Sequence, residues 1–129
     1  MSSFHSVLVA NRGEIARRVF RTCHRMGLST VAVFSDADEH APFAAEATSA
    51  VRLHGTASAD TYLRGDLVIA AAQRAGAGAI HPGYGFLSEN AQFVQAVEDH
   101  GLTFIGPTAE HIRIMGDKIT AKETAKSLG

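Results

Sequence analysis

The sequence predicts an α/β domain in which a parallel sheet is covered by helices on both faces. Short apolar segments alternate along the chain with segments of helical periodicity, about 20 to 30 residues apart, as expected for strands joined by crossover helices. The apolar segments are nearly uninterrupted, which is typical of strands buried on both faces of a parallel sheet. A length of 129 residues corresponds to one domain, 1–129.

The first strand is expected at residues 6–10, followed by a turn, Asn11-Arg12-Gly13-Glu14, and a helix that Gly27 ends. The apolar face of this helix is expected to hold Ile15, Val19, Cys23 and Met26, widened by Ala16 and Phe20. Arg17, Arg21 and Arg25 share the opposite side, where like charges repel. They form either a solvated face or a contact with an acidic partner or another subunit.

A second strand is expected at 30–34, ending in an acidic turn at 35–39. Asp36 lies near the position where a nicotinamide-binding domain holds a ribose. The first turn, however, lacks the G-x-G-x-x-G pattern and places Glu14 where a pyrophosphate would lie, which argues against a dinucleotide site. We therefore interpret Asp36, Asp38 and Glu39 as a solvated turn.

The second half of the chain continues the alternation. A helical turn at 42–47, a strand at 50–53 and a loop at 54–63 precede a helix that Asp66 caps and Gly76 ends. A fourth strand at 77–80 and a fifth at 102–105 enclose a helix with Phe93, Val94 and Val97 on its apolar side, ended by Gly101. A last helix is expected after Thr108, its cap, with Ile112 and Met115 facing inward.

The stretch at 81–90, His-Pro-Gly-Tyr-Gly-Phe-Leu-Ser-Glu-Asn, joins the fourth strand to the next helix and is the strongest candidate site. Gly83 and Gly85 allow positive φ and a close approach of a ligand to the backbone. Ser88 is expected to cap the helix, whose N-terminus would then suit an anion. The alternative is a tight strand-to-helix turn without a ligand.

Lys118 is a second candidate. Asp117 can cap a new helix, and a lysine in its first turn opposes the helix dipole unless an anion compensates its charge. The alternative is a solvated basic stripe that Lys118 forms with Lys122 and Lys126.

Composition excludes several classes of function. A net charge of −1 gives no field for nucleic acid or a membrane surface, and no apolar run approaches the roughly 20 residues of a membrane span. Cys23 is the one cysteine and is expected in the core, and the N-terminus lacks a signal peptide pattern, so a cytoplasmic protein is expected. The seven histidines show no metal-ligand spacing, and no serine or cysteine has an obvious base.

Three stretches in this order resemble the N-terminal domain of biotin carboxylase, as found in acyl-CoA carboxylase α-subunits and pyruvate carboxylase. They are Val9 to Ala16, His81 to Asn90, and Ile105-Gly106-Pro107 followed by Met115-Gly116-Asp117-Lys118, and the resemblance covers essentially the whole chain. It implies a Rossmann-like, pre-ATP-grasp domain. The family uses MgATP and bicarbonate to make carboxyphosphate and then carboxylates biotin on a carrier domain.

The resemblance also assigns residues. Lys118 matches a lysine that contacts ATP phosphate, and Tyr84, Gly85 and Phe86 match a turn facing bicarbonate and biotin. Asn11 and Glu14 match the first motif, where they shape the turn. The arginine-rich first helix corresponds to a region that contributes to a homodimer contact in bacterial relatives.

The implied partners are the remainder of the biotin carboxylase, the biotin carboxyl carrier domain and a carboxyltransferase subunit. The lid over ATP, the magnesium ligands and the groups acting on biotin belong to the ATP-grasp and C-terminal domains of the family, which are expected to be absent from this chain. It is therefore expected to hold no catalytic residue of its own and to be inactive alone. The alternatives are a noncatalytic binding or assembly module and a domain of another ATP-grasp ligase.

Two stretches depart from the family pattern. Residues 44–47 are Ala-Ala-Glu-Ala where relatives usually carry Ala-Asp-Glu-Ala, and Gly55-Thr56-Ala57-Ser58 replaces a more proline-rich loop. Neither contains a candidate site residue, so they affect the choice of subfamily and leave the family resemblance intact.

Overall fold

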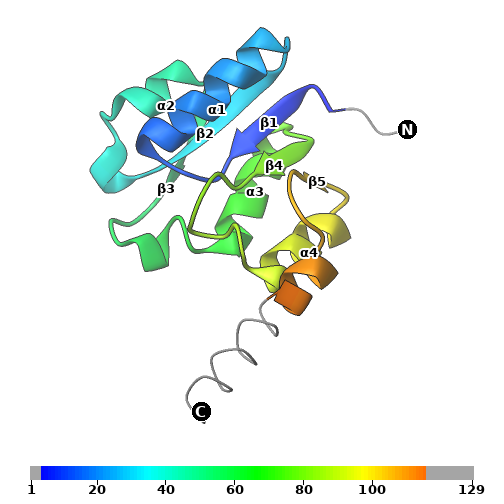
Figure 1. Ribbon diagram of the computed structural model, residues 1–129. Coiled ribbons are helices and arrows are strands. Elements are labelled where there is room, and N and C mark those ends of the chain that lie inside the picture. Colours follow the sequence, from blue (N-terminus) through cyan, green and yellow to red (C-terminus); the bar gives the residue numbers. More distant parts are fainter. Residues whose placement is uncertain (1–3, 116–129) are drawn as a thin grey trace, which may run out of the picture.

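A computed structural model describes residues 4–115, which form a five-stranded parallel sheet in the order β3-β2-β1-β4-β5 (Figure 1). The strands are β1 (Ser6–Val9), β2 (Ser29–Ser35), β3 (Ser49–Leu53), β4 (Ala79–His81) and β5 (Thr103–Phe104). The helices are α1 (Gly13–Arg25), α2 (Pro42–Glu46), α3 (Gly65–Ala75) and α4 (Ala91–Asp99), with 3-10 turns η1 (Asp36–Asp38) and η2 (Ser58–Asp60). A helical segment at 109–115 ends the described residues. The predicted fold class is confirmed.

The sheet separates two apolar layers because side chains alternate along each strand. Helices α1 and α2 cover one face, while α3 and α4 cover the other (Figure 1). Along β1, Val7 and Val9 pack toward Phe20 of α1, while Leu8 packs on the opposite side toward Val68 of α3. All of these side chains are at most 1% exposed. β1, the central strand, is therefore buried on both faces.

The buried face of α1 differs from the prediction. Ala16, Phe20 and Cys23 are buried, whereas Ile15 and Val19 are half-buried and Met26 is 70% exposed. Helix α1 ends at Arg25, and Met26 is its C-cap, so it lies at the exposed end of the helix, just before the chain turns at Gly27. The core location of Cys23 is confirmed.

At α3 and the last helix, two of the predicted helix-end residues are confirmed by the structure, and one predicted cap is wrong. Gly76 ends α3 in the left-handed conformation, as predicted. Thr108 caps the last helix as predicted, accepting a hydrogen bond from the His111 N–H (3.2 Å), although Met115 is 57% exposed. Asp66 is not the cap of α3; the N-cap is Arg64, and the Asp66 carboxylate pairs with its guanidinium at 2.8 Å.

No helix among residues 4–115 has the length and apolar character that crossing a membrane requires.

Candidate functional site

The candidate site lies where β1 and β4 end side by side. The chain leaves β1 through Asn11 and Arg12 into α1 on one face, and leaves β4 through residues 82–90 toward α4 on the other. Neighbouring parallel strands whose connections diverge in this way leave a crevice beyond their C-terminal ends, where α/β proteins bind ligands. The residues at this position are those that the two longest sequence motifs supply.

Asn11 joins the two loops. Its side chain is 1% exposed, and its Nδ2 donates to the Pro82 carbonyl (2.9 Å) and to the Tyr84 carbonyl (2.7 Å). Its Oδ1 accepts from the Arg12 N–H (2.9 Å), so each polar atom of the amide is hydrogen-bonded. The expectation that Asn11 shapes the turn of its own loop is incomplete, because this amide also holds the turn that follows β4.

We name residues 81–86 the Tyr84 turn. Gly83, Gly85 and Phe86 have positive φ angles of 67°, 75° and 44°. Gly83 also lies against Asn11, since a Cβ built on it would be 2.6 Å from Asn11 Nδ2. Glycine at this position therefore serves both the left-handed backbone and the contact between the loops.

The three predicted residues of the turn are placed differently. Tyr84 is 82% exposed, and Gly85 has open space where a side chain would be. Phe86 is half-buried, and its ring packs against Tyr62 with centroids 5.4 Å apart. Tyr84 and Gly85 thus present the turn to solvent, while Phe86 anchors it to the core.

The helix that follows begins later than predicted. Helix α4 starts at Ala91, and its N-cap is Asn90, whose Oδ1 accepts from the Phe93 N–H at 3.0 Å. Ser88 was the wrong cap; its own N–H donates to the Gly85 carbonyl (2.9 Å) within the loop. The glycine turn and the N-terminus of α4 are therefore separate features, with residues 87–90 between them along the chain.

The acidic turn after β2 is not simply solvated, which corrects the prediction for Asp38. Asp38 is 6% exposed and accepts two hydrogen bonds from Arg12, at 2.7 and 2.6 Å. The Tyr62 hydroxyl donates to the same carboxylate (2.6 Å) and accepts from the Ser35 N–H (3.0 Å). This network fastens the loop after β1 to the end of β2 and to the residues that support Phe86.

The Arg12 hydrogen bonds, followed by that of Tyr62, hold the pKa of Asp38 below its ordinary value. Its contribution to stability is therefore complete above the unfolded pKa near 3.9 and is lost as the pH falls through the lower folded pKa. We expect Asp38→Asn to lower the free energy of unfolding at pH 7 by about 2 kcal/mol. The deficit should shrink on acidification below pH about 4, as urea unfolding at several pH values would measure.

Asp66→Asn is the matched control, because Asp66 also binds an arginine through two bonds but is exposed. Its deficit should be clearly smaller, since exposed pairs contribute little. Equal losses for the two substitutions would contradict a special role for Asp38.

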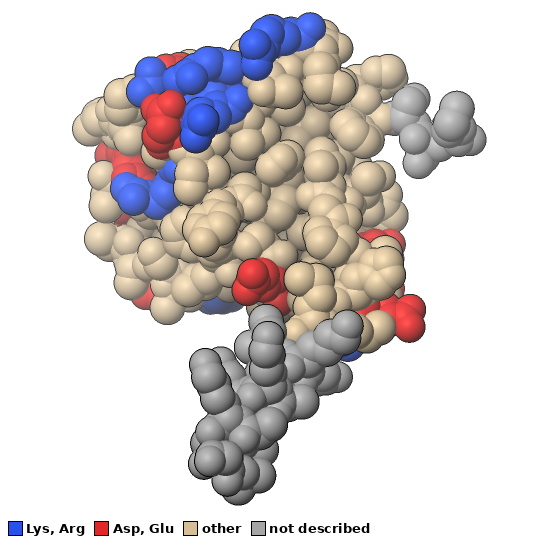
Figure 2. Space-filling model, in the orientation of Figure 1, with Lys and Arg blue, Asp and Glu red and all other residues tan. Residues whose placement is uncertain are grey.

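Arginines dominate the outer face of α1, and Figure 2 shows their basic side chains gathered over this helix. Arg17 binds Glu46 of α2 (2.9 Å), and Arg21 binds Glu14 (3.3 Å). The acidic partners for these two arginines thus come from within the chain, an arrangement that the spacing of the arginines alone did not indicate.

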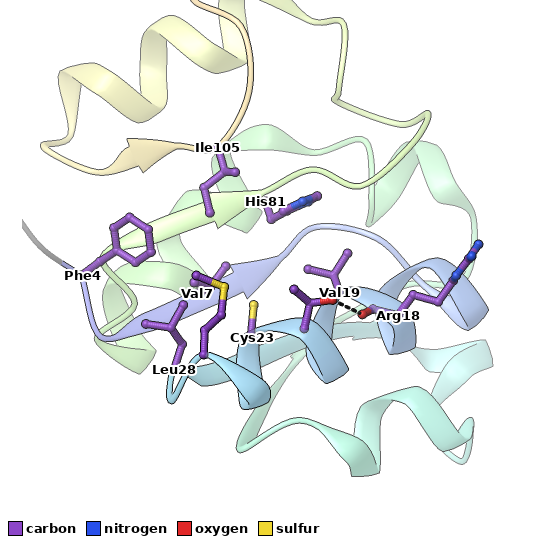
Figure 3. A pocket seen from close by; sticks show the side chains of 10 residues that line it. Phe4, Val7, Arg18, Val19, Cys23, Leu28, His81 and Ile105 are labelled. Carbon is purple, nitrogen blue, oxygen red and sulfur yellow. Dashed lines mark hydrogen bonds between the residues drawn. The ribbon is translucent and has the colours of Figure 1, made fainter.

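A mostly apolar hollow of about 420 Å³ lies between α1 and the sheet, near the end of β4 (Figure 3). It is lined by Val19 and Cys23 from α1, by Val7, by Ile105 and by His81 at the end of β4. Burial raises the pKa of the Cys23 thiol, which favours its neutral form.

Lys118 lies outside the described residues, so its predicted contact with phosphate stays a prediction. Sequence reasoning missed three residues near the site: Asp38 as a buried acceptor, Tyr62 as its donor, and His81 as a partner of the Tyr84 turn. The Pro-Gly pair after His81 is a turn signal that could have drawn attention to the last of these, because polar side chains can bond the backbone N–H two residues later in a turn.

Comparisons with known proteins agree with the sequence resemblance. A family model described as "Biotin carboxylase, N-terminal domain" matches residues 3–112. A biotin carboxylase from Nostoc sp. is 53% identical over 98% of this chain and 28% of its own length, and the methylcrotonoyl-CoA carboxylase α-subunit of Arabidopsis thaliana is 53% identical over 95% of this chain and 17% of its own. The biotin carboxylase domain of a thermophilic 2-oxoglutarate carboxylase, solved with bicarbonate, superimposes with a TM-score of 0.87 at 45% identity, covering 98% of this chain and 28% of that one.

Proposed function

The chain belongs to the biotin carboxylase N-terminal domain family, and from that premise we propose that it works as the N-terminal domain of a biotin carboxylase. Such an enzyme transfers a phosphoryl group from ATP to bicarbonate and then moves the carboxyl group from carboxyphosphate to a ureido nitrogen of biotin. The observation that carries the proposal is the exposed Tyr84 turn, held at the sheet's C-terminal edge by Asn11.

In this proposal the Tyr84 turn forms one wall of the bicarbonate and biotin site. Tyr84 offers an exposed ring with a hydroxyl, and Gly85 leaves the backbone accessible to a ligand. Backbone N–H groups on a fixed turn can orient an anion or a ureido oxygen without reorganising. Phe86 holds the turn in place from the core side.

Lys118 is proposed to contact ATP phosphate, in keeping with the sequence prediction that its charge opposes the dipole of a helix expected after Asp117. Among residues 4–115 no group of three or more His, Cys, Asp or Glu side chains is placed to hold a metal ion. We therefore assign Mg²⁺ no ligand among these described residues.

The proposed partners are the ATP-grasp and C-terminal portions of a biotin carboxylase, a biotin carboxyl carrier domain and a carboxyltransferase subunit. The chain spans 28% of the length of the Nostoc biotin carboxylase. The proposal also includes a homodimer contact through α1. It places the protein in the cytoplasm, because a single cysteine is typical of a reducing compartment. The Arabidopsis relative is named as mitochondrial.

The test is a chimera in which this chain replaces the matching N-terminal portion of the Pseudomonas aeruginosa biotin carboxylase, to which it is 50% identical. We expect the chimera to release ADP in a manner that depends on bicarbonate and biotin, and the isolated chain to release none. Lys118→Met in the chimera should raise the KM for ATP roughly tenfold, because a hydrogen bond to a charged group contributes about 1.5–3 kcal/mol.

The same substitution at Lys122 is the control and should leave the KM for ATP unchanged. A folded chimera without activity would refute the proposed domain role and favour a noncatalytic module. Bicarbonate-dependent ADP release by the isolated chain would refute its predicted inactivity.

A further inference from the structure

His81 makes two hydrogen bonds at the end of β4. Its carbonyl accepts from the Ala10 N–H (2.8 Å), which continues the pairing of β4 with β1, and its imidazole Nδ1 accepts from the Gly83 N–H (3.0 Å). Asn and Asp side chains close turns through the same bond to the N–H two residues later. The imidazole of His81 therefore occupies the position of an asparagine oxygen in an Asx turn.

We propose that His81 is a positioning residue, whose neutral imidazole holds the Gly83 N–H and thereby fixes the Tyr84 turn, and that protonation of the ring releases the turn. The bond requires a lone pair on Nδ1, so the ring hydrogen must lie on Nε2. Protonation converts both nitrogens into donors, which leaves two N–H groups facing each other. The importance of His81 for carboxylation rests on the proposed function, whereas the effect of His81 on the turn does not.

The surroundings of His81 favour the neutral ring. The ring is half-buried beside the apolar hollow, and burial lowers its pKa below the ordinary value near 6.5 (Figure 3). The charged and titratable side chains that line this hollow are Arg18 and Cys23, both from α1. Arg18 carries the same sign as an imidazolium, and the Cys23 thiol is neutral because burial raises its pKa.

Among residues 4–115, the other side chains that line the hollow are uncharged. The residues that line the hollow from β1 and from beyond β5 are Val7 and Ile105, and the nearby Asn11 side chain is a neutral amide. At neutral pH the ring therefore accepts the bond, and the turn should loosen only under mildly acidic conditions.

Nuclear magnetic resonance of the ¹⁵N-labelled chain tests this directly. Long-range ¹H–¹⁵N spectra at pH 7.5 should show the Nε2–H tautomer for His81. From pH 8 to 5, the Gly83 amide signal should shift with the midpoint of the ring, and Gly85 should follow. Gly76, a left-handed glycine at the end of α3, is the internal control and should not follow.

Two substitutions complete the test. His81→Asn retains an acceptor for the Gly83 N–H and cannot titrate, so the Gly83 amide should stay protected and its signal should become independent of pH. His81→Phe removes the acceptor, and hydrogen exchange at Gly83 should accelerate roughly fivefold, the effect of losing a bond worth about 1 kcal/mol.

A Gly83 signal that ignores the titration of His81, or an Nδ1–H tautomer at pH 7.5, would overturn the proposal. If His81→Phe does not fold, the comparison of His81→Asn with the unmodified chain still decides it. Because these measurements observe the turn itself, they stand whether or not the chimera carboxylates biotin.

Discussion

Gly83→Ala is expected to lower the free energy of unfolding by about 3 kcal/mol, which combines left-handed backbone strain with overpacking. The φ angle of Gly83 is 67°, a conformation that L-residues avoid. The added methyl group would also lie 2.6 Å from Asn11 Nδ2 and 2.9 Å from Ile15 Cγ2. Asn11 cannot yield easily, because both loops bind its amide.

Gly85→Ala is the matched control, since Gly85 has a similar φ of 75° but no atom within 4 Å of a built Cβ. Its cost should be about 1 kcal/mol, from backbone conformation alone. Urea unfolding of both variants, followed by far-UV circular dichroism, measures the difference. If the two alanines cost the same, the contact between Gly83 and Asn11 does not hold the loops together.

Asn11→Asp is expected to cost a similar amount, about 3 kcal/mol at pH 7, although the side chain barely changes in size. The substitution removes both donors from a buried position and places carboxylate oxygens against the carbonyls of Pro82 and Tyr84. Burial and these neighbours should raise the pKa of the new carboxyl group above its ordinary value. Because the folded pKa is raised, the stability lost by the variant should be regained as the pH falls. A carboxylate with a lowered folded pKa behaves in the opposite way, since its contribution to stability is lost on acidification.

Asn90→Asp applies the same chemical change at the N-cap of α4. There the side chain only accepts a hydrogen bond, from the Phe93 N–H, and a carboxylate accepts as well as an amide. We expect little change or a slight stabilisation from the helix dipole. Unfolding of both variants at pH 7 and pH 5 provides the comparison, and an Asn11→Asp variant as stable as Asn90→Asp would show that the Asn11 amide is not needed as a donor.

The candidate site was only partly predictable from the sequence. Gly83 and Gly85 were identified because glycine allows positive φ, and the structure confirms that conformation at both positions. Ser88 was a wrong cap, since cap preferences alone do not distinguish Ser88 from Asn90 two positions later. Phe86 was grouped with Tyr84, although its ring packs inward on Tyr62, a contact between residues from different loops.

The sequence by itself determined the parallel α/β architecture, the five strands and the family, because these depend on local periodicity and on contiguous motifs. Only the tertiary structure decided how the loops are joined. Asp38 was expected in solvent, yet it is buried against Arg12 and Tyr62, which lie 26 and 24 positions away. Asn11 meets the Tyr84 carbonyl across 73 positions because β1 and β4 are neighbours in the sheet. Local patterns carry no information about which distant polar groups will satisfy each other, and those pairings hold the site.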